Sequence, residues 1–181
     1  MAKPVVFVIG ATGNVGSATL QALSAKYADK VEIKAGVRNP GKADKIRTVA
    51  GVSIVQAEMG AKDKLVGTFA GVNALYIVTP GAENRTELTI ATAEAAKEAG
   101  VKHVVVVSVL TADLTDTVFG KQLKTVEEKI SKLGVPFTFL RLPLFVDNCW
   151  GFIRTQLWAN HPFFTRGPHK TIHSCCRGRF R

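Results

Sequence analysis

Tyrosine, cysteine and acidic residues are scarce in this chain of 181 residues, and each scarcity narrows its chemistry. There are two tyrosines and three cysteines, and 14 acidic residues stand against 24 lysines and arginines. The cysteines, Cys149, Cys175 and Cys176, are odd in number and lack metal-ligand spacing. A metal site is therefore not expected, and a reduced compartment, the cytoplasm, fits best.

Long apolar runs are also missing, since no run approaches the roughly eighteen apolar residues of a membrane span. A strand-like segment follows residues 1–4 directly, so no signal peptide is expected. Half of the formal net charge of +10 falls after residue 160, where five basic residues and no acid occur. Because no basic helix with interleaved aromatic residues is present, no nucleic-acid partner is expected.

What the chain does have is a glycine-rich stretch near its start. The apolar run Val5–Ile9 leads into Gly10-Ala11-Thr12-Gly13-Asn14-Val15-Gly16, with glycines at i, i+3 and i+6. Gly10 and Gly13 would let a pyrophosphate lie against the main chain, and Gly16 would let the next helix pack on the strand. The amino terminus of that helix would direct its unpaired N–H groups at the phosphates. The stretch predicts a dinucleotide site, with an ordinary tight turn as the alternative.

Arg38 bears on which dinucleotide binds. A site that prefers NAD carries an acid at the end of the second strand, about 20 residues past the glycines, to hold the ribose 2′-hydroxyl. This chain has Arg38 there, and Lys42 follows. A guanidinium pairs with a 2′-phosphate, so we expect NADP(H) to be preferred over NAD(H). The alternative is a solvated charge at a strand end.

Strand-like and helix-like segments alternate along the chain without a repeat. Strands are expected at 5–9, 31–38, 52–58, 74–80, 103–108 and 137–143, and helices at 14–27, 42–50, 65–70, 83–99 and 120–133. This alternation predicts an α/β fold, a doubly wound parallel sheet of the Rossmann type. Ligands bind at the carboxyl ends of such strands, where Glu58, Thr79 and Ser108 would lie. His103 falls at the opposite edge and is expected to be structural.

Taken together, several segments resemble the NmrA-like group of atypical short-chain dehydrogenases/reductases. The resemblance covers about residues 4 to 158 and depends on the glycine stretch, Val37-Arg38, 76–80, 95–108, 124–127 and 134–141, then Phe145 and Asn148. It implies an NADPH-dependent oxidoreductase that reduces a quinone or a similar small electrophile.

The same resemblance implies which residues form the sites. Pyrophosphate would be bound by the glycine loop with Thr12, Asn14 and Val15, and the 2′-phosphate by Arg38. Glu58 and Met59 would border the adenine, and Val78, Thr79 and Pro80 would line the nicotinamide side. Lys124 would reach the nicotinamide ribose. The Ser108 hydroxyl, from its place at a strand end, could meet substrate or nicotinamide, so Lys124 and Ser108 are the candidate catalytic residues. Phe145 and Asn148 would lead into the substrate cleft, and Lys124 with Glu127 could instead be only a helix-surface pair.

The chain departs from the family pattern at the proton donor. Many short-chain reductases use Tyr-x-x-x-Lys, but the residue four before Lys124 is Gly120, and neither Tyr27 nor Tyr76 has a lysine four residues later. Interconversion of alcohol and ketone through such a tyrosine is therefore not expected. Hydride transfer to a quinone or an activated double bond stays open. Two alternatives also stay open: a non-catalytic NADP(H) sensor that binds protein partners, and a remnant that folds poorly because a missing lobe leaves apolar surface exposed.

Length is the second departure. Family members run on to complete the sheet and to build a smaller substrate lobe, which would be largely missing here. We expect residues 1–158 to form the Rossmann domain and 159–181 a basic, divergent tail. The hypothesis is that this tail comes from a truncated or frame-shifted gene model, since a shifted frame from Ser174 can read Val-Ala-Val-Glu-Asp-Asp-Phe-Gly. Transcript sequencing tests it.

Overall fold

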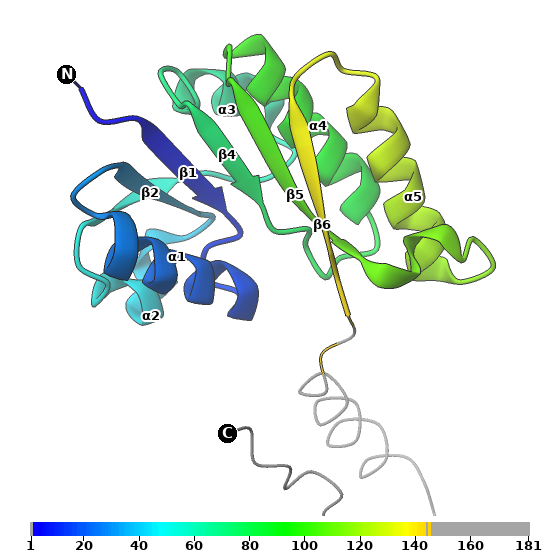
Figure 1. The fold of residues 1–181 in the computed structure, drawn as a ribbon, viewed down its shortest axis with the longest axis horizontal. Helices are drawn as coiled ribbons and strands as arrows, with labels where there is room; N and C mark the ends of the chain where they lie inside the picture. The colour runs from blue at the N-terminus through cyan, green and yellow to red at the C-terminus, as the bar shows by residue number, and fades with distance from the viewer. Residues whose placement is uncertain (1, 144, 146–181) are drawn as a thin grey trace, which may run out of the picture. The chain divides into compact units, whose positions relative to one another are not determined.

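A six-stranded parallel sheet forms the centre of the molecule (Figure 1). The computed structural model describes residues 2–143 and residue 145. The strands follow the order β3-β2-β1-β4-β5-β6, and every neighbouring pair is parallel. Their bounds are β1 Val5–Ile9, β2 Glu32–Val37, β3 Val52–Gln56, β4 Ala74–Ile77, β5 His103–Val109 and β6 Phe137–Leu142.

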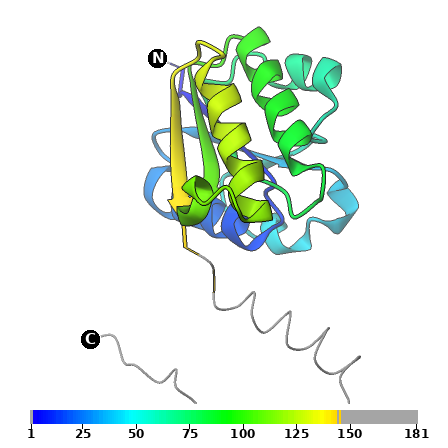
Figure 2. The same cartoon turned by 90° about the vertical axis from the view of Figure 1, so that its right-hand side faces the viewer.

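Helices cover both faces of the sheet because the inner strands are apolar on both sides. On one face, α1 (Asn14–Tyr27) and α2 (Asp44–Arg47) enclose a core that contains Val8, Leu20 and Ile33. On the other face lie α3 (Lys62–Thr68), α4 (Arg85–Glu98) and α5 (Val118–Ser131), and α4 and α5 run side by side in Figure 2. Two 3₁₀ turns complete the described elements, η1 (Pro40–Lys42) and η2 (Leu110–Asp113).

Strand register assigns alternate residues to the two faces. Phe7, Leu75 and Val104 are in register and face the core under α3, α4 and α5. Small side chains on α4 let that helix pack closely, because Ala93, Ala95 and Ala96 are fully buried against the sheet. The edge strand β6 is more open, with Phe137 and Leu140 among the exposed large apolar side chains.

The strand order reverses beside β1, and this reversal places the site. β1 has β2 on one side and β4 on the other. The chain runs outward from β1 through β2 to β3, then returns to β4 and runs outward in the opposite direction through β5 to β6. In doubly wound sheets a crevice opens at such a point, outside the carboxyl ends of the strands. In Figure 1 these ends share the lower edge of the sheet.

The predicted α/β fold is confirmed, with small differences in bounds. The strand Val5–Ile9 and the helix Asn14–Tyr27 are found with the expected bounds. The helix expected at 42–50 is only Asp44–Arg47, because Pro40–Lys42 forms a separate 3₁₀ turn whose Asn39 side chain accepts from the Gly41 N–H. The helix expected from residue 120 begins at Val118, where the Thr117 hydroxyl caps it.

The first compact unit of the chain ends at Pro143. The expected domain boundary at Trp158 and the tail 159–181 lie outside the described residues. Among the described residues, no helix is long and apolar enough to cross a membrane.

Candidate functional site

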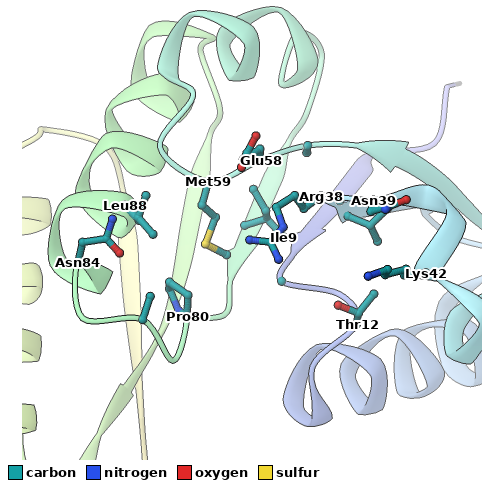
Figure 3. Close-up of a pocket in the computed structure, with 15 residues that line it drawn as sticks. Ile9, Thr12, Arg38, Asn39, Lys42, Glu58, Met59, Pro80, Asn84 and Leu88 are labelled. Carbon is teal, nitrogen blue, oxygen red and sulfur yellow. The ribbon is translucent and has the colours of Figure 1, made fainter.

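A cavity of about 570 Å³ opens at the carboxyl edge of the sheet, where the strand order reverses. The loops that follow β1, β2, β3 and β4 all contribute to its wall. Its lining residues are Ile9, Gly10, Thr12, Gly36, Val37, Arg38, Asn39, Lys42, Ala57, Glu58, Met59, Pro80, Ala82, Asn84 and Leu88. Figure 3 shows Met59 and Pro80 on one side and Thr12 and Lys42 on the other.

The glycine loop contributes Gly10 and Thr12 to the cavity wall. At two of its glycines the surrounding atoms leave no room for a Cβ. Gly10 has a φ of +79°, and a Cβ there would lie 3.0 Å from both the Cβ and the carbonyl oxygen of Val78. At Gly16 a Cβ would lie 2.3 Å from the Gly10 carbonyl oxygen. Gly16 therefore lets α1 begin directly against the loop, as predicted.

Gly13 is different from its two neighbours. It is the N-cap of α1 with φ −72° and ψ 167°, an extended conformation that any residue adopts. A Cβ there would meet only the Gly10 carbonyl oxygen, at the ordinary contact distance of 3.5 Å. No close contact requires glycine at this position, although glycine is favoured at an N-cap. The absence of a side chain leaves the backbone open to a ligand lying against the loop.

Cations dominate the side of the cavity beyond β2. Arg38 follows the last residue of β2 and Lys42 ends η1, and both extend their cationic ends toward the cavity in Figure 3. Among the described residues no salt bridge engages either side chain. Two unneutralised cations next to a glycine-rich helix start favour an anionic ligand.

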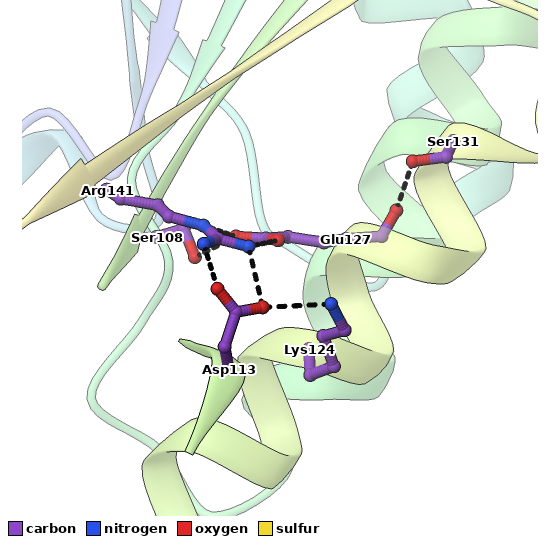
Figure 4. Close-up of polar contacts among 6 residues, drawn as sticks. All are labelled: Ser108, Asp113, Lys124, Glu127, Ser131 and Arg141. Carbon is purple, nitrogen blue, oxygen red and sulfur yellow. Dashed lines mark hydrogen bonds and ion pairs between the residues drawn. The ribbon is translucent and has the colours of Figure 1, made fainter. Parts of the chain in front are cut away.

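A second group of polar residues lies at the carboxyl ends of β5 and β6 (Figure 4). Arg141 donates from Nε and Nη2 to the two oxygens of Glu127, at 3.0 and 2.6 Å. It also donates to both oxygens of Asp113, at 2.5 and 3.2 Å. Lys124 donates to Asp113 Oδ1 at 2.9 Å, and the Ser108 hydroxyl donates to Glu127 Oε1 at 2.6 Å.

These contacts set the ionisation of the group. Burial alone would raise the pKa of Glu127, but the hydrogen bonds from Arg141 and Ser108 together hold that pKa below its usual value. The hydrogen bonds from Arg141 and Lys124 lower the pKa of Asp113 to about 2. Asp113 in turn raises the pKa of Lys124, so two cations and two carboxylates stay charged together at neutral pH.

Comparison with known proteins decides the family. Residues 2–171 match the NmrA-like family. The chain belongs to the NmrA-like family. The matched range includes the glycine loop, the cavity and the polar group of Figure 4, and it continues past Trp158.

Curated proteins and solved structures are similar over most of this chain. An NAD(P)H azoreductase of Xenophilus azovorans is 28% identical over 144 residues, which cover 79% of this chain and 49% of that protein. A crystal structure of an NADPH-dependent quinone oxidoreductase from Escherichia coli, complexed with NADPH, has a TM-score of 0.74 at 27% identity and covers 82% of this chain and 52% of that chain. Triphenylmethane reductase of Citrobacter sp., complexed with NADP(H), has a TM-score of 0.70 at 29% identity and covers 80% of this chain and 51% of that chain. The chain therefore spans about half the length of these relatives.

Six of the residues expected from the NmrA-like resemblance line the cavity: Gly10, Thr12, Arg38, Glu58, Met59 and Pro80. Six others do not line it, although they follow directly after β1 or β4 or lie in the first turn of α1: Gly13, Asn14, Val15, Gly16, Val78 and Thr79. The Thr79 hydroxyl donates to the Val107 carbonyl oxygen at 2.6 Å and ties the ends of β4 and β5 together. Phe145 is exposed in its own unit, and Asn148 lies outside the described residues.

Lys124 and Ser108 belong to the polar group rather than to the cavity wall. Ser108 is 3% exposed, and its hydroxyl is turned to Glu127. Lys124 and Glu127 do not form the helix-surface pair weighed as an alternative, because each has a different partner. The sequence reasoning missed Asp113 and Arg141 as partners, as well as Asn84 and Leu88, which line the cavity from the start of α4 at i and i+4.

Proposed function

We propose that this chain binds NADP(H) in the cavity and is the cofactor-binding part of an NADPH-dependent oxidoreductase that reduces a quinone or a similar small electrophile. The observation that carries the proposal is that the glycine loop and two cations without a salt bridge among the described residues, Arg38 and Lys42, lie at one cavity. Relatives with names that state a nicotinamide cofactor support it.

The residues present fit such a cofactor. The first turn of α1 would hold the pyrophosphate with backbone N–H groups, with Thr12 beside it. Arg38 would bind the 2′-phosphate, with Lys42 nearby, and Met59 and Glu58 would border the adenine. Val78, Thr79 and Pro80 would line the nicotinamide side, and Lys124 would donate to the nicotinamide ribose.

The proposed chemistry assigns few steps to this chain. When bound, NADPH supplies the hydride. The residues of this chain bind and orient the cofactor, while the proton comes from solvent or from another group, because no tyrosine precedes Lys124 at the required spacing. Ser108 would have to release Glu127 before its hydroxyl could reach a substrate. In the structure the Ser108 hydroxyl donates to Glu127 and helps to hold that carboxylate in place.

The comparisons give the alternative, a non-catalytic NADP(H) sensor, no support. The curated relatives carry the names of reductases and oxidoreductases. We expect the protein to act in the cytoplasm on a small molecule, without nucleic acid.

A titration of the purified chain with NADPH and with NADH tests the binding part of the proposal, with thermal melts to show that the chain is folded. NADPH oxidation with a panel of quinones tests the reaction. A folded chain that binds neither nucleotide contradicts the proposal. Tight binding without turnover would support the cofactor site but reject the proposed reaction for a chain of this length.

Replacing Arg38 by glutamate should weaken NADPH binding much more than NADH binding, by about 1.5–3 kcal/mol, because charge-assisted hydrogen bonds to the 2′-phosphate are lost. The measurement is calorimetric titration with both nucleotides. Lys45→Glu is the matched control, since Lys45 is an exposed cation of α2 that does not line the cavity. Equal losses for the two nucleotides would reject the role of Arg38 in specificity.

A further inference from the structure

Asp113 lies between two cations at the carboxyl edge of the sheet. It belongs to η2, the 3₁₀ turn that directly follows β5. Arg141, near the end of β6, donates to both carboxylate oxygens of Asp113, and Lys124 of α5 donates to one of them. Figure 4 shows the carboxylate of Asp113 pointing to the space where the side chains of Arg141 and Lys124 meet.

The position of Asp113 is set from the interior of the domain. Arg141 is held by Glu127, whose side chain is only 8% exposed and accepts a further hydrogen bond from buried Ser108. A guanidinium bonded by two carboxylates in bidentate fashion has little rotational freedom, because its planar fork matches both geometries at once. The buried end of the group therefore fixes the exposed end.

Lys124 is the member of the group that has capacity for a ligand. An ammonium carries three donors, and among the described residues Asp113 is its one hydrogen-bonded acceptor. Its long side chain would otherwise sample many rotamers, and ordering such a chain on binding weakens affinity. The contact with Asp113 holds the ammonium at the same edge of the sheet that the cavity occupies.

We propose that Asp113 is the positioning residue of Lys124: it holds the ammonium ready for the ribose of the nicotinamide nucleotide, and Arg141 with Glu127 holds Asp113. The inference deepens the proposed function and rests on it. Asp113 touches neither cofactor nor substrate in this scheme. It acts through Lys124, so its effect on binding should vanish when Lys124 is removed.

The exposure of the Asp113–Lys124 pair separates a role in positioning Lys124 from a role in folding stability. The side chains of Asp113 and Lys124 are 60% and 36% exposed, and pairs this open contribute little to folding stability. Loss of the pair should therefore change nucleotide binding far more than it changes the melting temperature. The charged groups around Lys124 are Asp113 from η2, Arg141 from β6, and Glu127 and Glu128 from its own helix.

A double-mutant cycle on the full 181-residue chain tests the inference. The variants are Asp113→Asn, Lys124→Met and the two combined, with Asp116→Asn as control because Asp116 is an exposed acid of the same loop. We expect Asp113→Asn to weaken NADPH binding about tenfold, because Lys124 loses its preorganised position. Asp116→Asn should bind like the wild type, and the double variant should bind no more weakly than Lys124→Met.

The reactivity of Lys124 gives a second readout that a merely structural role would not move. Asp113 raises the pKa of Lys124, so Asp113→Asn should lower that pKa and increase the fraction of neutral amine. Acylation of Lys124 should then be faster, by roughly tenfold at most for each unit by which the pKa falls. Lys121, one turn earlier on α5, is the internal reference in the same mass-spectrometric digest. Bound NADPH should protect Lys124 and leave Lys121 unchanged.

The outcomes separate this inference from the proposed function. A wild-type chain that binds no NADPH overturns both. If the wild type binds but Asp113→Asn behaves like Asp116→Asn, or weakens binding equally with and without Lys124, the positioning role alone is rejected. Failure of NADPH to protect Lys124 in a chain that binds it also rejects that role.

Discussion

Gly16 and Gly13 are three residues apart in one loop, yet their surroundings differ. A Cβ at Gly16 would lie 2.3 Å from the Gly10 carbonyl oxygen and 2.9 Å from the Ala11 Cα, both backbone atoms. A Cβ at Gly13 would have an ordinary contact at 3.5 Å. The fold therefore requires glycine at Gly16. At Gly13 the absence of a side chain leaves the backbone open to a ligand.

This contrast gives a prediction with its own control. Gly16→Ala should lower the free energy of unfolding by about 1–3 kcal/mol, because α1 must move away from the loop. Gly13→Ala should stay within about 0.5 kcal/mol of the wild type, because a weaker N-cap is offset by lower entropy of the unfolded chain. Urea denaturation measures both. NADPH affinity should still fall for Gly13→Ala if the pyrophosphate lies against this residue, and unchanged affinity would contradict that position.

At the scale of elements, Glu127 joins α5 to the ends of β5 and β6. Its carboxylate accepts hydrogen bonds from Ser108 on β5 and Arg141 on β6. The folded state holds the pKa of Glu127 below its ordinary value, so the unfolded state takes up the proton first as pH falls. The stabilisation is complete above the ordinary pKa of 4.5 and is lost as pH falls through the lower, folded value.

Glu127→Gln should test this linkage, since glutamine resembles the protonated acid. At pH 7 the variant should be less stable by about 1–3 kcal/mol, because charge-assisted hydrogen bonds become neutral ones. The difference should shrink as pH falls below about 4.5, because the unfolded wild type takes up the proton there while folded Glu127 keeps its charge to a lower pH. Thermal melts from pH 7 to pH 2 provide the measurement. Parallel curves would contradict the linkage, and Glu128→Gln, at the exposed next position of α5, should follow the wild type throughout.

The elements themselves were largely predictable, and the contacts between them were not. Apolar runs predict the strands. The start of α5 is hidden in a Thr-rich loop, because its cap is a side-chain contact in which the Thr117 hydroxyl accepts from the Gly120 N–H. Arg141 and Asp113 are 28 residues apart and meet only because β6 pairs with β5. Spacing along one chain carries no record of such a pairing, so the role of Arg141 could not be found there.

For the whole molecule, the sheet divides at β1 into two parts, β3-β2-β1 and β4-β5-β6, which are joined by the β1–β4 pairing, pack together in the core that contains Phe7 and Leu75, and both contribute to the cavity. Loops after β1 and β2 supply the glycines and cations, and loops after β3 and β4 supply Met59, Pro80 and Asn84. The sequence could place most of these residues at one edge because parallel strands present the same end together. Which of them line a common cavity depends on the strand order, which the structure provides.

A ligand in this cavity should therefore tie both parts of the sheet together, and hydrogen exchange can detect that coupling. At NADPH concentrations near 100 times the dissociation constant, binding adds about 2.7 kcal/mol to the folded state. Amides that exchange only when the ligand has left should then slow about 100-fold. We expect this in the loops at 10–16, 38–42, 58–60 and 79–84, which come from both parts.

The opposite edge of the sheet is the internal control for that measurement. The turns at 100–102 and 134–136 precede β5 and β6 and contribute nothing to the cavity. Their amides exchange by local opening that leaves the ligand bound, so their rates should not change. Protection confined to the loops at 10–16, 38–42 and 58–60 would show that the nucleotide contacts only the first part, because β3 belongs to it. Such a result would remove β4 and its loop from the site.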